Sequence, residues 1–170
     1  MPTPPEVEAI MESLRGENDI GVAIVASALM EAALERLLTT KFKTKSKDLL
    51  GRVFQNEGPL SNFHGKILVA QAFGVITSPL AEEMHRIRAI RNAFAHAKVA
   101  ISFSNEIVQR EVASLKLITT ISNIQKVKWE PALAGKRAFL LAVELMLIML
   151  DYAGNHEGDA DAALAEALKA

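Results

Sequence analysis

Three polar residues that could take part in chemistry, Arg91, Asn92 and His96, lie close together in the chain. An arginine binds phosphate through its planar fork of N–H donors, and a histidine can gain or lose a proton near neutral pH. Residues 84–98 carry several basic side chains and no acid, and residues 41–47 form a second basic run. The two runs predict a phosphate-binding patch, although solvated helix ends would have the same composition. Its residues are Lys41, Lys43, Lys45, Lys47, Arg86 and Arg88.

The element that must position the three residues is a helix predicted over residues 78–97. Ser78 can cap its first turn, and Pro79 suits the first helical position. At about 100° per residue, one face of this helix is apolar, and Arg91 falls near the middle of that face. The face consists of Leu80, Met84, Ile87, Phe94 and Ala95. Because a charge that faces a core needs a partner, we expect Arg91 to be buried and paired with Glu31 or Glu144.

The spacing of Arg91, Asn92 and His96 resembles the Arg-x4–6-His motif of HEPN domains (higher eukaryotes and prokaryotes nucleotide-binding). This resemblance implies an all-α fold, often dimeric, that cleaves RNA without metal. The histidine would act as acid or base, and the arginine would bind phosphate and stabilise developing charge. On a regular helix, however, residues five positions apart point roughly 140° away from each other. The alternative is that Asn92 and His96 only cap the end of the helix.

Composition limits the classes of protein to consider. Half of the 170 residues are hydrophobic but only 5% are aromatic, so aliphatic side chains must build the core. The chain has no cysteine, and no two of its four histidines have ligand spacing on one helix face, so we predict no metal and no cofactor. We find no signal peptide and no apolar run of the ~20 residues that span a membrane. We therefore expect a cytoplasmic protein.

Helical spacing of apolar residues recurs along the chain. It predicts an all-α, single-domain compact bundle of about six or seven helices over residues 1–154. Helices expected at 20–42 and 131–152 are apolar on nearly every side, which places them at the centre. A short extended piece is expected at 99–103, followed by a helix that ends near residue 122. Residues 155–170 are acidic with few large apolar groups, and we expect a loosely held tail.

Four stretches in order resemble the mannitol operon repressor family: Ile20–Leu38, Gly58–Phe63, Lys66–Ile76 and Ile87–His96. Together they cover most of residues 19–97. This resemblance implies an all-α fold and transcriptional repression of genes for sugar-alcohol uptake. It implies no established catalytic residues.

The sequence argues against direct reading of operator DNA. The best helix–turn–helix candidate spans residues 65–96, but one face of its second helix is committed to the core, and Glu82, Arg86 and Ala89 lie opposite. We therefore predict a regulator, without enzymatic activity, that acts through a protein partner or a ligand and is compatible with a homodimer. The alternatives are a HEPN-like metal-independent endoribonuclease or RNA-binding module, and a plain structural bundle.

Overall fold

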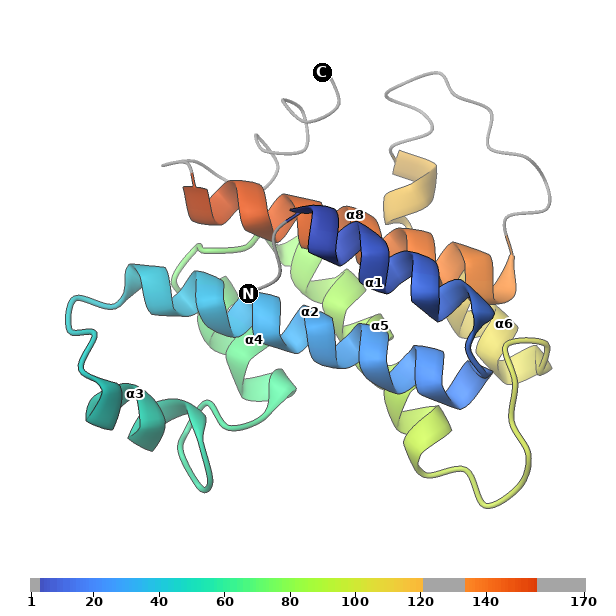
Figure 1. Cartoon of the computed structure of the whole chain (residues 1–170), viewed down its shortest axis with the longest axis horizontal. Helices are drawn as coiled ribbons and strands as arrows, with labels where there is room; N and C mark the ends of the chain where they lie inside the picture. Colours follow the sequence, from blue (N-terminus) through green and yellow to red (C-terminus); the bar gives the residue numbers. More distant parts are fainter. Residues whose placement is uncertain (1–3, 121–133, 156–170) are drawn as a thin grey trace. The chain divides into compact units, whose positions relative to one another are not determined.

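The structure, a computed structural model, describes residues 4–120 and 134–155. Seven helices have defined bounds, as Figure 1 shows: α1 (Pro4–Gly16), α2 (Asp19–Lys41), α3 (Lys47–Phe54), α4 (Phe63–Ala72), α5 (Ser78–Ala95), α6 (Glu106–Ala113) and α8 (Gly135–Asn155). Residues 117–120 are also helical, and the described residues contain no strand. The all-α prediction is confirmed.

Side-chain caps define where several helices begin. The Ser46 hydroxyl accepts a hydrogen bond from the N–H of Leu49 at the start of α3, and the Asn62 side chain accepts one from Gly65 at the start of α4. At α5 the N–H of Leu80 donates to the Thr77 hydroxyl over 3.4 Å. The prediction of Ser78 as the cap is therefore off by one residue. Ser78 is the first helical residue instead.

Two segments differ from the sequence predictions. The piece expected to be extended at 99–103 forms no strand, because its contacts are made with side chains and not with a neighbouring strand. The N–H of Ser102 donates to the side-chain oxygen of Asn105, and the ring of Phe103 lies 4.8 Å from that of Phe94 and 5.1 Å from that of Phe139. The helix expected to reach residue 122 breaks at Ser114, whose hydroxyl donates to the carbonyl of Glu111 and ends α6. The predicted tail at 155–170 and the segment 121–133 lie outside the described residues, apart from Asn155 at the end of α8.

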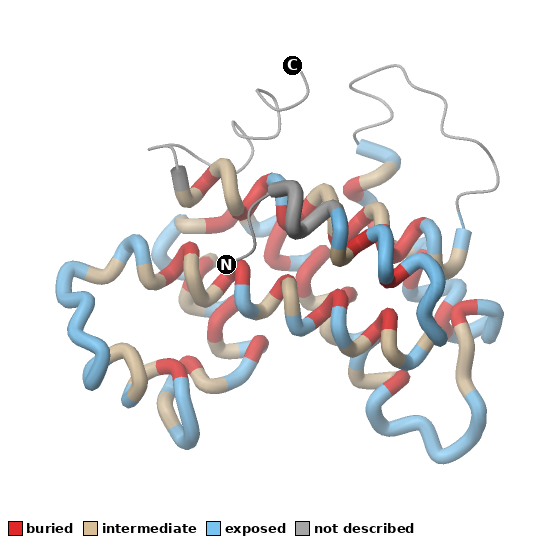
Figure 2. The backbone as a smooth tube through the Cα atoms, in the orientation of Figure 1, coloured by how far each residue is buried: buried red, intermediate tan, exposed pale blue. Residues whose placement is uncertain are grey.

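The chain divides into two compact units, each described here by itself. The first contains Met1–Leu29 and Arg86–Met146. Its core is built by buried side chains of α1, α2, α5, α6 and α8: Met11, Leu14, Val22, Ile87, Ile90, Phe94, Val108, Val112, Phe139 and Val143. Buried and exposed residues follow each other along each helix in Figure 2, which is the pattern of amphipathic packing. The prediction of a single domain over residues 1–154 stays a prediction.

The second unit contains Met30–His85 and Leu147–Ala170. Its buried residues include Met30, Leu34, Leu37, Leu38, Phe54, Phe63, Ile67, Ile76, Leu80, Met84, Met149 and Leu150. Between α3 and α4 the chain turns tightly, and a Cβ at Gly58 would lie 2.4 Å from the carbonyl oxygen of Val53. This close approach explains why the turn has a glycine at this position.

The two helices whose sequences are apolar on nearly every side, α2 and α8, are not buried on every side. In α2 the side chains of Ile20 and Val25 are 47% and 41% exposed, and Leu29 is half-buried. In α8 Met149 is buried, whereas Leu145 is half-buried. The central position that we predicted for the helix at 20–42 is therefore wrong for the side of α2 that carries Val25, since apolar composition alone does not say which side of a helix a neighbour covers. None of the helices within 4–120 and 134–155 is long and apolar enough to cross a membrane.

Candidate functional site

Arg91 does not occupy the buried face of α5. It is exposed, and its guanidinium donates a hydrogen bond to the side-chain oxygen of Asn92 over 3.2 Å. The buried face runs through Ile87, Ile90 and Phe94, and Arg91 follows Ile90 by one residue, about 100° further around the helix. Our prediction of a buried Arg91 is wrong because it counted the exposed Ala95 as part of the inner face and passed over Ile90.

His96 lies immediately beyond α5. Its backbone N–H donates to the carbonyl of Asn92 over 3.0 Å, which closes the last turn of the helix. The side chain of His96 is exposed, and among the described residues no hydrogen bond joins it to Arg91 or Asn92. The structure thus brings Arg91 and Asn92 together at the surface, with His96 near them in the chain. A catalytic role for the three residues stays a prediction.

Because Arg91 is exposed, its removal should cost little stability. We expect Arg91→Ala to change the free energy of unfolding by less than about 0.5 kcal/mol, as is usual for surface substitutions. Urea unfolding of the parent and variant would measure this. A loss of several kcal/mol would mean that Arg91 is buried in solution after all.

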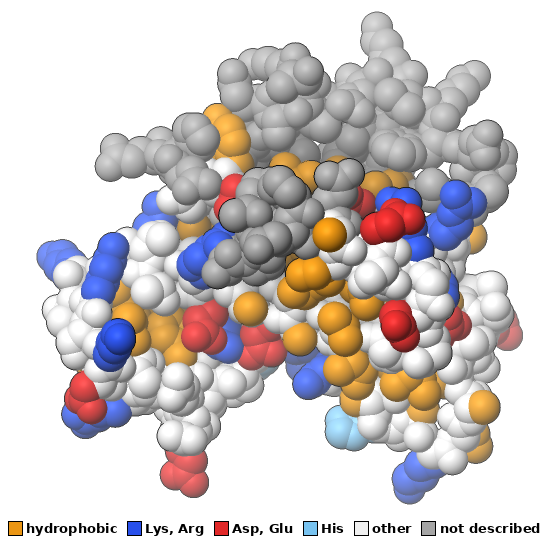
Figure 3. Space-filling model, in the orientation of Figure 1, with side chains coloured by type: hydrophobic (Ala, Val, Ile, Leu, Met, Phe, Trp, Pro, Cys, Tyr) orange, Lys and Arg blue, Asp and Glu red, His pale blue; other side chains and the backbone are white. Residues whose placement is uncertain are grey.

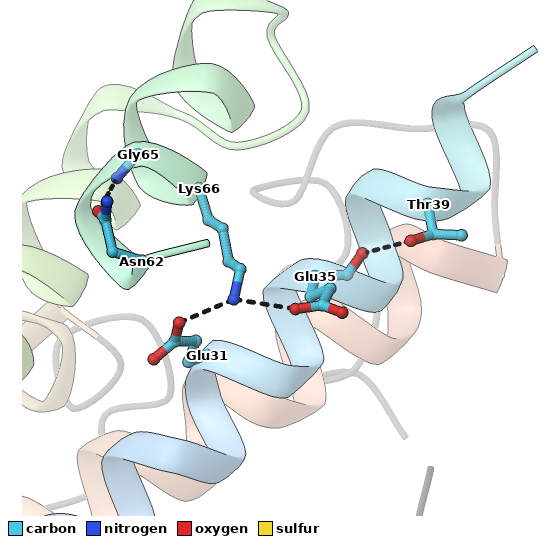
Figure 4. Close-up of polar contacts among 6 residues, drawn as sticks. All are labelled: Glu31, Glu35, Thr39, Asn62, Gly65 and Lys66. Atoms are coloured by element: carbon cyan, nitrogen blue, oxygen red, sulfur yellow. Dashed lines mark hydrogen bonds and ion pairs between the residues drawn. The ribbon is translucent and has the colours of Figure 1, made fainter. Parts of the chain in front are cut away.

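Among the described residues of the second unit, Lys66 is a buried charge, as is Glu83. The sequence predictions missed Lys66. Its side chain is 4% exposed and projects from α4 toward two carboxylates of α2, as Figure 4 shows. The ammonium nitrogen lies 2.7 Å from an oxygen of Glu31 and 2.9 Å from an oxygen of Glu35. Glu31, which we predicted as a partner of Arg91, is therefore a partner of Lys66. The available signal was a lysine directly before the apolar run Ile67–Ala70 of α4.

Both carboxylates act on the protonation of Lys66. Burial by itself lowers the pKa of the ammonium group, since it disfavours the charged form. The hydrogen bonds to Glu31 and Glu35 and their negative charges outweigh burial, so the pKa of Lys66 is raised from its ordinary value of 10.5. Lys66 is charged at neutral pH, and its ion pairs join α2 to α4. This cluster fixes structure and is not arranged as a catalytic acid or base.

Glu144, the other predicted partner of Arg91, is half-buried in the first unit. It lines a cavity of about 370 Å³ together with Arg15, Lys136 and Arg137. Lys136 already contacts Asp19, with 3.3 Å between nitrogen and oxygen, and it donates to the carbonyl of Glu17. The cavity therefore combines an apolar wall with cationic groups that are partly neutralised within the protein.

The residues of the predicted basic patch belong to different elements. Lys41 ends α2, and Lys43, Lys45 and Lys47 follow it as exposed side chains in the second unit. Arg86 and Arg88 lie on α5 in the first unit and are half-buried. The exposed lysines form a continuous basic segment along the chain, whereas phosphate binding by the whole predicted patch stays a prediction.

Two of the histidines within the described residues lie close together. The rings of His64 and His85 lie 5.3 Å apart in the second unit. Within the described part of the chain, no group of three or more histidine, aspartate or glutamate side chains is placed to hold a metal ion.

Comparison with known families identifies the chain. The sequence profile of the family described as "Mannitol repressor" (MtlR) matches residues 6–146. The chain belongs to the mannitol repressor family. This match extends the resemblance, which rested on residues 19–97, into the part of the chain that contains α6 and α8. Among curated proteins, no sequence match was found.

Two solved structures share the fold of this mannitol repressor family chain. MtlR from Escherichia coli, in a structure of the MtlR–HPr complex, superposes with a TM-score of 0.66 at 17% identity and covers 83% of this chain and 95% of its own. A possible transcriptional regulator, YggD, from Shigella flexneri 2a superposes with a TM-score of 0.66 at 16% identity, over 86% of this chain and 96% of its own. At these identities the likeness concerns the fold.

Proposed function

We propose that this chain is a transcriptional regulator that acts by contacting another protein, rather than by reading operator DNA itself. The observation that carries the proposal is the solved complex of MtlR from Escherichia coli with HPr, in which a chain of this fold and family is bound to a protein. HPr is therefore the first partner to test for this chain.

The outer side of α5 supports the proposal, because it is a poor surface for reading bases. Leu80, Met84 and Ile87 are buried. On the opposite side, Glu82 and Ala89 are exposed, whereas Arg86 is half-buried. A recognition helix needs exposed polar and basic side chains that reach the major groove. The net charge of −1 also gives little general attraction to DNA.

The proposal predicts two binding results for the purified chain. It should form a complex with HPr from the same organism, measured by isothermal titration calorimetry. Its dissociation constant for the operator of the regulated gene should be no lower than that of non-specific DNA binding, about 10⁻⁴–10⁻⁶ M at physiological salt. Fluorescence anisotropy would measure it. A DNA duplex of unrelated sequence and equal length is the control.

Either measurement can contradict the proposal. Specific repressors reach dissociation constants of about 10⁻⁸–10⁻¹¹ M, so nanomolar, salt-sensitive binding to the operator by the chain alone would show direct reading. Failure of HPr to bind would remove the support that this proposal takes from the MtlR–HPr complex.

A further inference from the structure

The second unit contains an apolar cavity at the surface. It has a volume of about 360 Å³ and is lined by the ends of three helices. Leu38 and Phe42 come from the end of α2 and the residue beyond it, Val69 from α4, and Ala153 from the end of α8. The ring of Phe42 stacks on that of Phe54 in α3 at 5.5 Å, which fixes one wall. The cavity can take a large apolar side chain.

A solvent-exposed aromatic ring lies at this cavity. Phe73, which follows α4 and lines the cavity, is 79% exposed, and Leu68 on the preceding turn is 46% exposed. Gly74 follows with φ +65°, a left-handed conformation that ends the helix and holds Phe73 at its terminus. Single exposed apolar residues are common. An exposed phenylalanine beside an apolar cavity is the arrangement of a docking surface.

One lysine lines the same cavity, and three more follow it in the chain. Lys41 lines it, and Lys43, Lys45 and Lys47 are exposed in the segment that follows α2. Figure 3 shows hydrophobic side chains among Lys and Arg side chains over the end of α2 and over α3. The acid in this segment, Asp48, lies 4.0 Å from Arg52, and both side chains are largely exposed. The lysine segment therefore has a positive charge that acidic residues within it do not cancel.

We propose that this lysine-bordered cavity binds an acidic amphipathic helix of a partner protein, with one apolar side chain of that helix inserted between Phe42 and Val69. An amphipathic helix that lies in an apolar groove is held by anchors spaced three and four residues apart. Lys41 lines the cavity, and the exposed Lys43 and Lys45 follow within four residues, so their positive charge favours acidic side chains that flank the anchor. Such charge complementarity steers association and fixes orientation. Binding of such a helix at this cavity does not depend on whether the chain also binds HPr.

The shape of the cavity favours a protein segment over RNA. Single-stranded nucleic acid binds by stacking bases on exposed aromatic faces along a basic groove. Here the cavity is concave, and aliphatic side chains contribute much of its lining, including Leu38, Val69, Val75 and Ala153. The aliphatic walls offer no aromatic face. Of the two lining rings, Phe42 is half-buried, so the exposed Phe73 offers a face to a single base rather than to successive bases. An apolar side chain fills this space, and the lysines remain at the rim.

The proposal is tested on the full chain with a fluorescein-labelled helical peptide. Its leucines, at positions i and i+4, share one face, and glutamates occupy the other faces. We expect binding in fluorescence anisotropy that weakens with rising salt. Lys43→Glu/Lys45→Glu should weaken it about tenfold or more, and Phe73→Ser should weaken it similarly at every salt concentration. These residues are exposed, so the variants should fold.

Matched controls come from the first unit. Lys98→Glu reverses the charge of an exposed lysine, and Ile107→Ser removes an exposed apolar side chain. Neither substitution should change the affinity for the peptide. A peptide with serines in place of the leucines should bind much more weakly. The proposal is overturned if the leucine peptide does not bind, if the cavity variants bind it as the parent does, or if a single-stranded RNA of equal charge binds more tightly than the peptide.

Discussion

Replacing both carboxylates that hold Lys66 should strongly destabilise the protein. In Glu31→Gln/Glu35→Gln the ammonium of Lys66 keeps its 4% exposure but loses both negative partners. Stranding a buried charge costs about 3–5 kcal/mol. We expect a loss near 3 kcal/mol, the lower end of that range, because the glutamine oxygens can still accept hydrogen bonds. Urea unfolding followed by circular dichroism would measure the loss.

The opposite change should cost less. Lys66→Met leaves Glu31 and Glu35, whose side chains are 27% and 38% exposed and can be hydrated. We expect a loss of about 1–2 kcal/mol, from the missing hydrogen bonds and the like charges four residues apart. Glu106→Gln is a control, because its ion pair with Arg110 is exposed. If the double glutamine variant unfolds at the same urea concentration as this control, Lys66 is not a buried charge.

The ion pairs also predict a dependence on pH. The pKa of Lys66 is raised above 10.5 in the folded chain, so the folded state binds its proton more tightly than the unfolded state does. This contribution to stability is fully present below pH 10.5 and is lost as the pH rises through the higher folded pKa. The difference in stability between parent and Lys66→Met should therefore shrink above pH 10.5. A constant difference would contradict the raised pKa.

Local signals in the sequence were sufficient to predict the helices. Apolar residues three and four apart predicted α2 and α5 with ends within one or two residues, since this spacing and the capping residues act locally. The start of α8 at Gly135 rather than residue 131 was not predicted. At Gly135 the backbone has φ +56°, and the residue lies close to Phe103, which is a distant contact that local patterns do not contain.

The charged residues of the candidate site were harder to place. One residue of rotation on a helix is about 100°, so including Ala95 in the inner face of α5 was enough to assign Arg91 to the core in place of Ile90. The partners of Lys66 are Glu31 and Glu35 of α2, which lie 35 and 31 residues away in the chain. No motif or repeat in the sequence links them to Lys66. Pairing across helices depends on tertiary packing, which one sequence does not reveal.

Phe139→Ala should also strongly destabilise the chain. Phe139 is 0% exposed in α8, and its ring lies 5.1 Å from that of Phe103, which lies 4.8 Å from that of Phe94. Truncating a buried phenylalanine costs about 3–5 kcal/mol, because apolar burial is lost and a cavity remains. Phe73→Ala is the matched control, since Phe73 is 79% exposed. Similar urea midpoints for the two variants would show that Phe139 does not fill the core.

The same substitution should loosen the segment that follows Arg91 and His96. Phe103 anchors that segment through its ring contacts and through its N–H, which donates to a carboxylate oxygen of Asp19 over 2.9 Å. Without the ring of Phe139, the hydrogen bond to Asp19 and the ring contact with Phe94 should hold the segment less firmly. Hydrogen exchange should therefore speed up at amides 97–105 beyond the global change in stability. Exchange that rises only in proportion to global unfolding would mean that Phe139 stabilises the core without positioning the segment beside His96.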